Sequence, residues 1–69
     1  MLRLKYERRR RGWNQTTLAA RARLSQGVVS LIETGRLRPT ETHLRRLAQA
    51  LKVQPPRELL VETPLRGVQ

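Results

Sequence analysis

Apolar side chains recur along this chain at the three- and four-residue spacing of amphipathic helices. The clearest instance is the series Leu44, Leu47, Ala48 and Leu51. These residues stand at positions i, i+3, i+4 and i+7, so a helix would carry all of them on one face. No stretch alternates between apolar and polar residues for long enough to predict a strand. The pattern therefore predicts an all-α fold.

Residues that favour the ends of helices divide the chain into five short segments. The first segment, Leu2 to Arg11, is rich in helix-forming residues. A residue that caps helices through its side chain precedes each of the next three segments, and proline opens the fifth. Glycine follows the first and third segments, where helices commonly end in a left-handed residue. The boundary residues in chain order are Gly12, Asn14, Ser25, Gly35, Thr40 and the pair Pro55–Pro56. We therefore expect a compact bundle of five short helices.

The same spacing sets the expected extent of the folded domain. Apolar residues suited to a core continue as far as Val61, whereas the residues from Glu62 onward offer little to bury. A chain of 69 residues suffices for one domain with a small core. We expect one domain over residues 1–61 and a flexible tail over residues 62–69.

Positive charge dominates the composition. Fifteen basic residues oppose five acidic ones, which gives a formal net charge of +10, and thirteen of the fifteen are arginine. Because guanidinium groups bind phosphate through a planar set of donors, this excess favours a nucleic acid as the partner. Charge alone leaves a membrane surface or an acidic protein open as alternatives.

The sequence lacks the residues that several classes of protein function require. The chain has no cysteine and one histidine, His43, so we expect no disulfide, no metal site and no cofactor. No acid–base pair or activated nucleophile can be recognised, so we do not expect an enzyme. Because no apolar run could span a membrane and no secretory signal is recognisable, we expect a cytoplasmic, nucleoid-associated protein.

The segments that begin at Asn14 and Ser25 carry the strongest functional signal. Both are short, and a turn of about three residues, Ala22 to Leu24, joins them. Ala19 is small at the point where the two helices are expected to cross, so their backbones can approach closely. This arrangement is typical of a helix-turn-helix.

The third segment is expected to turn an uncharged face away from the core. With Val29 at the centre of the buried side, the helical repeat places five residues on or beside the opposite face. These are Gln26, Gly27, Ser30, Leu31 and Thr34. A glutamine amide can bridge two atoms of adenine, a serine hydroxyl can donate or accept, and leucine can contact the thymine methyl group. The face therefore suits the major groove of DNA.

Three stretches of this chain resemble a known family. They read NQTTLA at Asn14–Ala19, SQGVVSLIETG at Ser25–Gly35, and RP at Arg38–Pro39. With the apolar residues at 44–53, they resemble the Cro and lambda-repressor (XRE) family of helix-turn-helix DNA-binding proteins. The resemblance covers about residues 4–60. It implies a lambda-repressor-like domain whose second and third helices form the helix-turn-helix and whose third helix enters the major groove.

The resemblance also implies roles for individual residues. The base-reading positions of the family are occupied by Gln26, Gly27, Ser30 and Leu31. The phosphate-binding positions are occupied by Gln15, Thr34, Arg36 and Arg38. An internal ion pair with a structural role is implied between Arg8 and Glu33.

Several residues depart from the family pattern, among them Arg9, at a position of the first helix that is often apolar. The turn position that is often glycine is Arg23, which must tolerate either a strained backbone or a modified turn. Gly27 offers no side chain to a base and weakens its helix by about 1 kcal/mol relative to alanine. We therefore expect few direct base contacts, with the shape of the DNA supplying part of the specificity.

Together these features predict a sequence-specific transcriptional regulator, with repression as the expected mode. It would bind a near-palindromic site on double-stranded DNA as a homodimer, with dimer contacts from Leu59, Leu60 and Val61. Bound to its site, it would block or recruit polymerase. Two alternatives keep the fold: an antitoxin that also binds a toxin through its tail, and an adaptor or coactivator that uses the scaffold to bind proteins. Nonspecific nucleoid or RNA binding is less favoured, because the expected reading face is neutral.

Overall fold

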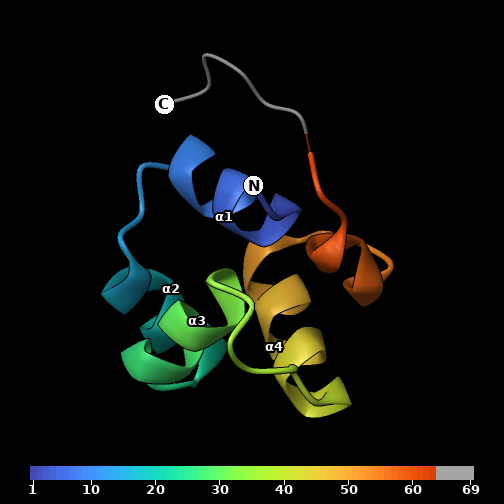
Figure 1. Cartoon of the computed structure of the whole chain (residues 1–69). Helices are drawn as coiled ribbons and strands as arrows, with labels where there is room; N and C mark the ends of the chain where they lie inside the picture. Colours follow the sequence, from blue (N-terminus) through green and yellow to red (C-terminus); the bar gives the residue numbers. More distant parts are fainter. Residues whose placement is uncertain (64–69) are drawn as a thin grey trace.

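The computed structural model describes residues 1–63 and shows four α-helices followed by one 3-10 helix (Figure 1). In chain order these are α1 (Arg3–Arg10), α2 (Gln15–Ala22), α3 (Gln26–Glu33), α4 (Glu41–Leu51) and η1 (Pro56–Leu60). The predicted all-α bundle is confirmed, with the difference that the fifth element is a 3-10 helix. Within residues 1–63, β pairing is limited to an isolated bridge between Leu2 and Glu62.

Side-chain hydrogen bonds begin α2, α3 and α4 at the predicted residues. In each case a side-chain oxygen accepts from the backbone N–H three residues later, which satisfies a donor that the first turn leaves unpaired. The pairs are Asn14–Thr17 at 2.7 Å, Ser25–Val28 at 3.1 Å and Thr40–His43 at 3.1 Å. His43 returns the contact, since its ring Nδ1 accepts from the Thr40 N–H at 3.2 Å. The single histidine therefore has a structural role at the start of α4.

A left-handed residue follows each of the four α-helices. Gly12 and Gly35, with φ angles of 73° and 76°, follow α1 and α3 as predicted. Arg23 and Lys52, with φ angles of 58° and 57°, take the same conformation directly after α2 and α4. For a residue other than glycine this conformation costs about 1 kcal/mol. The turn between α2 and α3 therefore forms at Arg23 despite the missing glycine.

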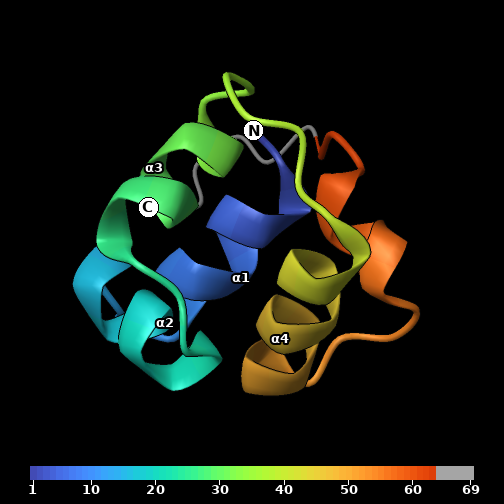
Figure 2. The ribbon, with the colours of Figure 1, turned by 90° about the horizontal axis from the view of Figure 1, so that it is seen from below.

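The core lies where α2, α3 and α4 meet, and it extends toward α1 and η1 (Figures 1 and 2). The helix α2 packs against both α3 and α4, and η1 packs against α1 and α4. Trp13, in the loop between α1 and α2, is half-buried against this core. The buried apolar residues are Leu4, Leu18, Ala19, Ala22, Val29, Ile32, Leu47, Ala48, Leu51, Val53 and Leu59.

The helix η1 corrects one prediction. Leu59, expected to contribute to a dimer contact, is 0% exposed and belongs to the core. Leu60 and Val61, the other two residues of that expected contact, are exposed at 37% and 45%. Only these two residues of the three could therefore meet a partner.

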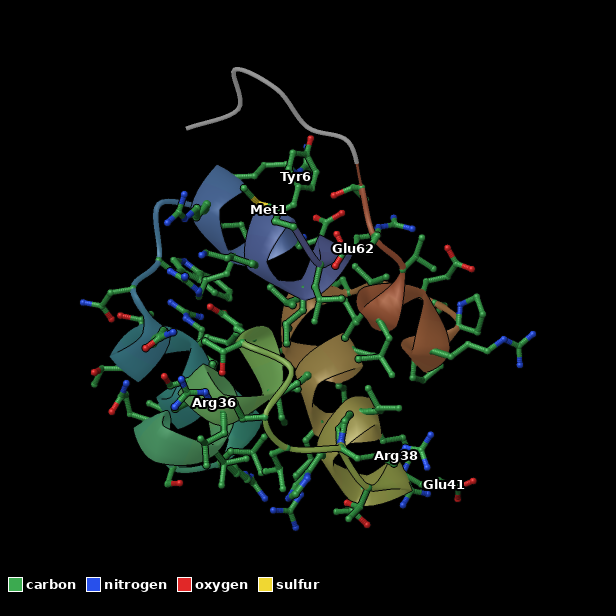
Figure 3. The ribbon with its side chains drawn as sticks, viewed as in Figure 1. Met1, Tyr6, Arg36, Arg38, Glu41 and Glu62 are labelled. Carbon is green, nitrogen blue, oxygen red and sulfur yellow. The ribbon has the colours of Figure 1, made fainter. Side chains whose placement is uncertain are left out.

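The two ends of the described chain lie side by side. The N–H of Thr63 donates to the Met1 carbonyl, and the N–H of Arg3 donates to the Val61 carbonyl, each at 2.8 Å. The Met1 ammonium lies 3.2 Å from the Glu62 carboxylate, and Figure 3 shows these two residues close together beside α1. Residues 62 and 63, the first two of the predicted tail, are therefore bonded to the domain. The remainder of the predicted tail lies outside the described residues.

Glu7 is buried on α1 among three arginines. Its carboxylate pairs with Arg11 at 2.7 Å, with Arg3 at 3.2 Å and with Arg10 at 3.3 Å. Burial by itself raises the pKa of Glu7, but the hydrogen bonds and charges of these arginines outweigh burial and hold the pKa below its usual value. Arg11 also donates to the carbonyl of Leu51 at 2.6 Å, at the C-terminal end of α4. The cluster thereby joins α1 to α4.

Replacing Glu7 with glutamine should make the stability of the protein less dependent on pH. Because the folded pKa is lowered, the stabilisation is complete above the pKa of the unfolded chain and is lost as the pH falls through the folded value. We expect the variant to be about 2 kcal/mol less stable near neutral pH, and the difference to vanish in strong acid. Urea unfolding across this pH range measures both effects. A difference that persists unchanged into strong acid would show that Glu7 acts through its shape alone.

Candidate nucleic-acid interface

The helix α3 has one buried side and one open side. The buried side consists of Val29 and Ile32, which are almost inaccessible to solvent. The open side carries the predicted reading residues, which are exposed or half-buried: Gln26, Gly27, Ser30 and Leu31. Apart from the two neighbouring residues and the backbone of α3 itself, a Cβ atom at Gly27 would meet no described atom within 4 Å, so packing among residues 1–63 does not require glycine there. The open side is therefore an uncharged surface that a partner can approach closely.

Hydrogen bonds hold Gln26 in place at the start of α3. Its side-chain N–H donates to Gln15 Oε1 at 2.7 Å, and the Gln15 amide donates in turn to Glu33 Oε1 at 3.1 Å. Among the contacts of residues 1–63, the Gln26 amide keeps its carbonyl oxygen and its second N–H free. One acceptor and one donor in a plane form the set that pairs with N6 and N7 of adenine. Gln15 also keeps one N–H, which is available to a phosphate oxygen.

This bond between Gln15 and Gln26 was missed by reasoning from the sequence. The two residues are the first residues of α2 and α3, the consecutive helices of the predicted helix-turn-helix. Amide side chains at equivalent positions of two crossing helices are a signal that could have indicated the contact. Its consequence is that the predicted phosphate-binding and base-reading glutamines form one unit.

Arg8 and Glu33 connect α1 to the end of α3. Two parallel hydrogen bonds join them: Arg8 Nε donates to Glu33 Oε2 at 2.7 Å, and Nη2 donates to Oε1 at 3.0 Å. Arg8 Nη1 also donates to the carbonyl of Trp13 at 2.9 Å. The Glu33 side chain is 1% exposed, so the pair is withdrawn from solvent. This ion pair fixes the carboxylate to which Gln15 is bonded.

The predicted phosphate-binding residues around the α3–α4 loop are of two kinds. Arg36 and Arg38 are exposed, and neither forms an ion pair within residues 1–63. Figure 3 shows Arg36 over α3 and Arg38 beside the start of α4. The hydroxyl of Thr34 instead donates to the carbonyls of Ser30 and Leu31, at 3.1 and 3.2 Å. Its proton is used inside the helix, so the two arginines are the stronger phosphate ligands.

Acidic groups are nearly absent from the surface of the helix-turn-helix. The chain has no aspartate or glutamate between Glu7 and Glu33, and the Glu33 carboxylate is buried. Exposed arginines on α2 and in the turn that follows it, Arg21 and Arg23, form no ion pair in the described part of the chain. A neutral reading face beside uncompensated positive charge is the combination that base and phosphate contacts require.

The buried polar groups of the described residues show no sign of a second site. Every buried side-chain nitrogen and oxygen in the described residues has a hydrogen-bond partner. The same part of the chain gathers no three His, Cys, Asp or Glu side chains that could hold a metal ion. Among its helices, none has both the length and the apolar character that crossing a membrane requires.

Comparison with known proteins identifies the family. A family model described as helix-turn-helix matches residues 4–57, which is most of the chain. The chain belongs to this helix-turn-helix family, of the Cro and lambda-repressor (XRE) type, and is a DNA-binding regulator. Searches of curated proteins and of solved structures found no match.

Proposed function

We propose that this protein is a sequence-specific transcriptional regulator of the repressor kind, which inserts α3 into the major groove of double-stranded DNA. The observation that carries the proposal is the open face of α3, with the Gln26 amide held by Gln15 so that one donor and one acceptor remain free. A helix with its buried side anchored and its polar side open has the width and the chemistry for direct reading of bases.

Phosphate contacts are proposed on both sides of this helix. Arg36 and Arg38 lie in the loop that follows α3, and the free N–H of Gln15 lies at the start of α2. Backbone contacts of this kind fix the register of a protein on the duplex, whereas base contacts supply the specificity. Because Gly27 has no side chain, Gln26, Ser30 and Leu31 are left to read the bases.

The proposed homodimer uses the surface around η1. Leu60 and Val61 are exposed there, and η1 borders a hollow of about 350 Å³ against α4. The hollow is lined by Glu41, Leu44, Arg45, Pro55, Pro56 and Arg57. Apolar atoms flanked by charges of both signs favour a contact between two copies, because a two-fold axis brings each acid of one copy toward the arginines of the other. To read a near-palindromic site, such a dimer has to place its two α3 helices about one turn of DNA apart.

Selection of bound duplexes from a random pool tests this function. We expect enrichment of one motif made of two inverted half-sites, with centres about 34 Å apart along the duplex. The protein should be selected at a stated salt concentration, since affinity for DNA has no meaning without it. A pool that remains random after several rounds, while still binding the protein, would contradict sequence-specific reading.

Substitutions at Gln26 and Arg38 should have different effects on the selected duplex. Gln26→Ala should reduce the preference for the selected duplex over a random one by about 1–3 kcal/mol, because it removes a paired donor and acceptor. Arg38→Ala should weaken both duplexes alike, because a phosphate contact carries no sequence information. Fluorescence anisotropy at fixed salt measures both quantities, and Gln54→Ala, at an exposed glutamine outside α3, is the matched control. Equal losses on both duplexes for Gln26→Ala would contradict base reading at this residue.

A further inference from the structure

A second basic surface lies away from the proposed reading face. It is a hollow of about 460 Å³ between the end of α2 and the second half of α4. Its lining residues are Arg21, Ala22, Arg23, Arg46, Gln49 and Ala50. We refer to it below as the arginine hollow. Figure 2 shows the end of α2 beside the last turns of α4, at the side of the molecule opposite the α3–α4 loop.

Internal contacts restrain two of the three guanidinium groups that line the arginine hollow. The guanidinium carbon of Arg21 lies 4.4 Å from the centre of the Trp13 ring, over which it stacks. Arg46 Nη1 donates to the backbone carbonyl of Arg23 at 3.2 Å. None of the three arginines forms an ion pair with a carboxylate of residues 1–63. Restrained charges without counterions lose little freedom when they bind an anion.

The backbone at Arg23 adds a second argument. Its left-handed conformation is one in which glycine is favoured, so the arginine is kept at a cost of about 1 kcal/mol. Within residues 1–63 the Arg23 side chain forms no hydrogen bond or ion pair that would offset this cost, since the bond to Arg46 uses the main-chain carbonyl. Its remaining place in the structure is the wall of the arginine hollow.

A duplex held by α3 would leave the arginine hollow open. On α2, Gln15 faces α3 through its bond to Gln26, whereas Arg21 lies against Trp13 in the loop after α1. On α4, the first turn follows the loop that carries Arg36 and Arg38, whereas the hollow borders the later turns. The proposed DNA contacts and the hollow therefore belong to different faces.

We propose that the arginine hollow binds an acidic segment of another protein. Arginine pairs with carboxylates through two parallel hydrogen bonds, and three guanidinium groups around one hollow can receive neighbouring acidic side chains. Gln49 offers both an acceptor and donors beside them. A peptide backbone can use both, because it has N–H and C=O groups, whereas a phosphodiester backbone has no donor. The composition of the wall thus favours a protein segment over a second duplex.

The single tryptophan provides the test, because Trp13 lies against Arg21 at the edge of the arginine hollow. The probe is a hexaglutamate peptide, which does not fluoresce, titrated into the full chain at constant ionic strength. Arg23→Gly/Arg46→Ala removes two charges from the hollow, leaves Arg21 on the tryptophan and relieves the left-handed residue, so the variant is expected to fold. Arg9→Ala/Lys52→Gly is the matched control: it removes the same charge from exposed positions outside the hollow, and it also replaces a left-handed residue with glycine.

We expect a saturable change in Trp13 fluorescence with the wild type. Peptide affinity should fall at least about tenfold in Arg23→Gly/Arg46→Ala and less than about twofold in Arg9→Ala/Lys52→Gly. Equal losses in the two variants would overturn the proposal, because net charge alone would then explain binding. It would also be overturned if inorganic phosphate saturated the hollow more tightly than the peptide. Displacement of the peptide by a selected duplex would likewise overturn it, since the hollow would then belong to the DNA-binding surface.

Discussion

Replacing Arg8 with methionine should lower the free energy of unfolding by about 3–5 kcal/mol, because the Glu33 carboxylate would stay buried without its counterion. Methionine keeps much of the arginine stem, so the loss reports the guanidinium group and not a cavity. A domain of this size has a total stability of roughly 5 kcal/mol, so about 0–2 kcal/mol would remain and the variant should unfold at a much lower urea concentration than the wild type. Urea unfolding followed by circular dichroism measures the change.

The control removes both members of this ion pair. Arg8→Met/Glu33→Leu leaves no buried charge, and such replacements are often neutral or stabilising. We expect the double variant to recover most of the lost stability. It should not recover base discrimination, because Gln15 loses the carboxylate that positions it against Gln26. A single variant that loses less than about 1 kcal/mol would show that solvent reaches the Glu33 carboxylate.

The affinity for a selected duplex should fall about ten-thousandfold between roughly 50 and 200 mM monovalent salt. A dimer that neutralises roughly eight phosphates gives a slope of about −7 when the logarithm of affinity is plotted against the logarithm of salt concentration. The exposed arginines make this expectation strong, because no carboxylate stands between Glu7 and Glu33 to oppose them. Equilibrium binding at several salt concentrations gives the slope directly.

The contribution of a single arginine to this salt dependence can be measured by substitution. Arg38→Ala should make it shallower by about 1 for each copy that binds, because one phosphate contact is lost. Arg9→Ala, at an exposed arginine on α1, is the matched control and should leave the slope unchanged. A wild-type slope near zero would count against DNA as the partner. A slope unaffected by Arg38→Ala would remove this residue from the phosphate contacts.

The helix boundaries could be predicted because each depends on residues only a few positions apart. Asn14, Ser25 and Thr40 accept hydrogen bonds from N–H groups three residues later, so their role can be read locally. The amphipathic pattern of α4 is similarly local, and it correctly indicated that Leu47 and Leu51 are buried. The strained turn at Arg23 could be predicted for the same reason, because the left-handed backbone conformation involves a single residue of the turn.

Contacts between distant residues were harder to predict. Leu59, Leu60 and Val61 are adjacent and all apolar, and periodicity cannot say which of three neighbours points inward on a short 3-10 helix. The bond from Arg11 to the Leu51 carbonyl joins residues 40 positions apart and depends on how α1 packs near the end of α4. No local pattern encodes either result. The arginine hollow was invisible for the same reason, since two separate helices form it.

The hydrogen-bonded series from Arg8 through Glu33 and Gln15 to Gln26 has a consequence for genetics. A screen for alleles that no longer bind a selected duplex should recover substitutions in α1, outside the proposed DNA contacts, alongside substitutions in α3. The amount of protein that accumulates in the cell should distinguish the substitutions in α1 from those in α3. Alleles at Arg8 should yield little protein because proteases remove it, whereas alleles at Gln26 should accumulate normally and fail only at recognition.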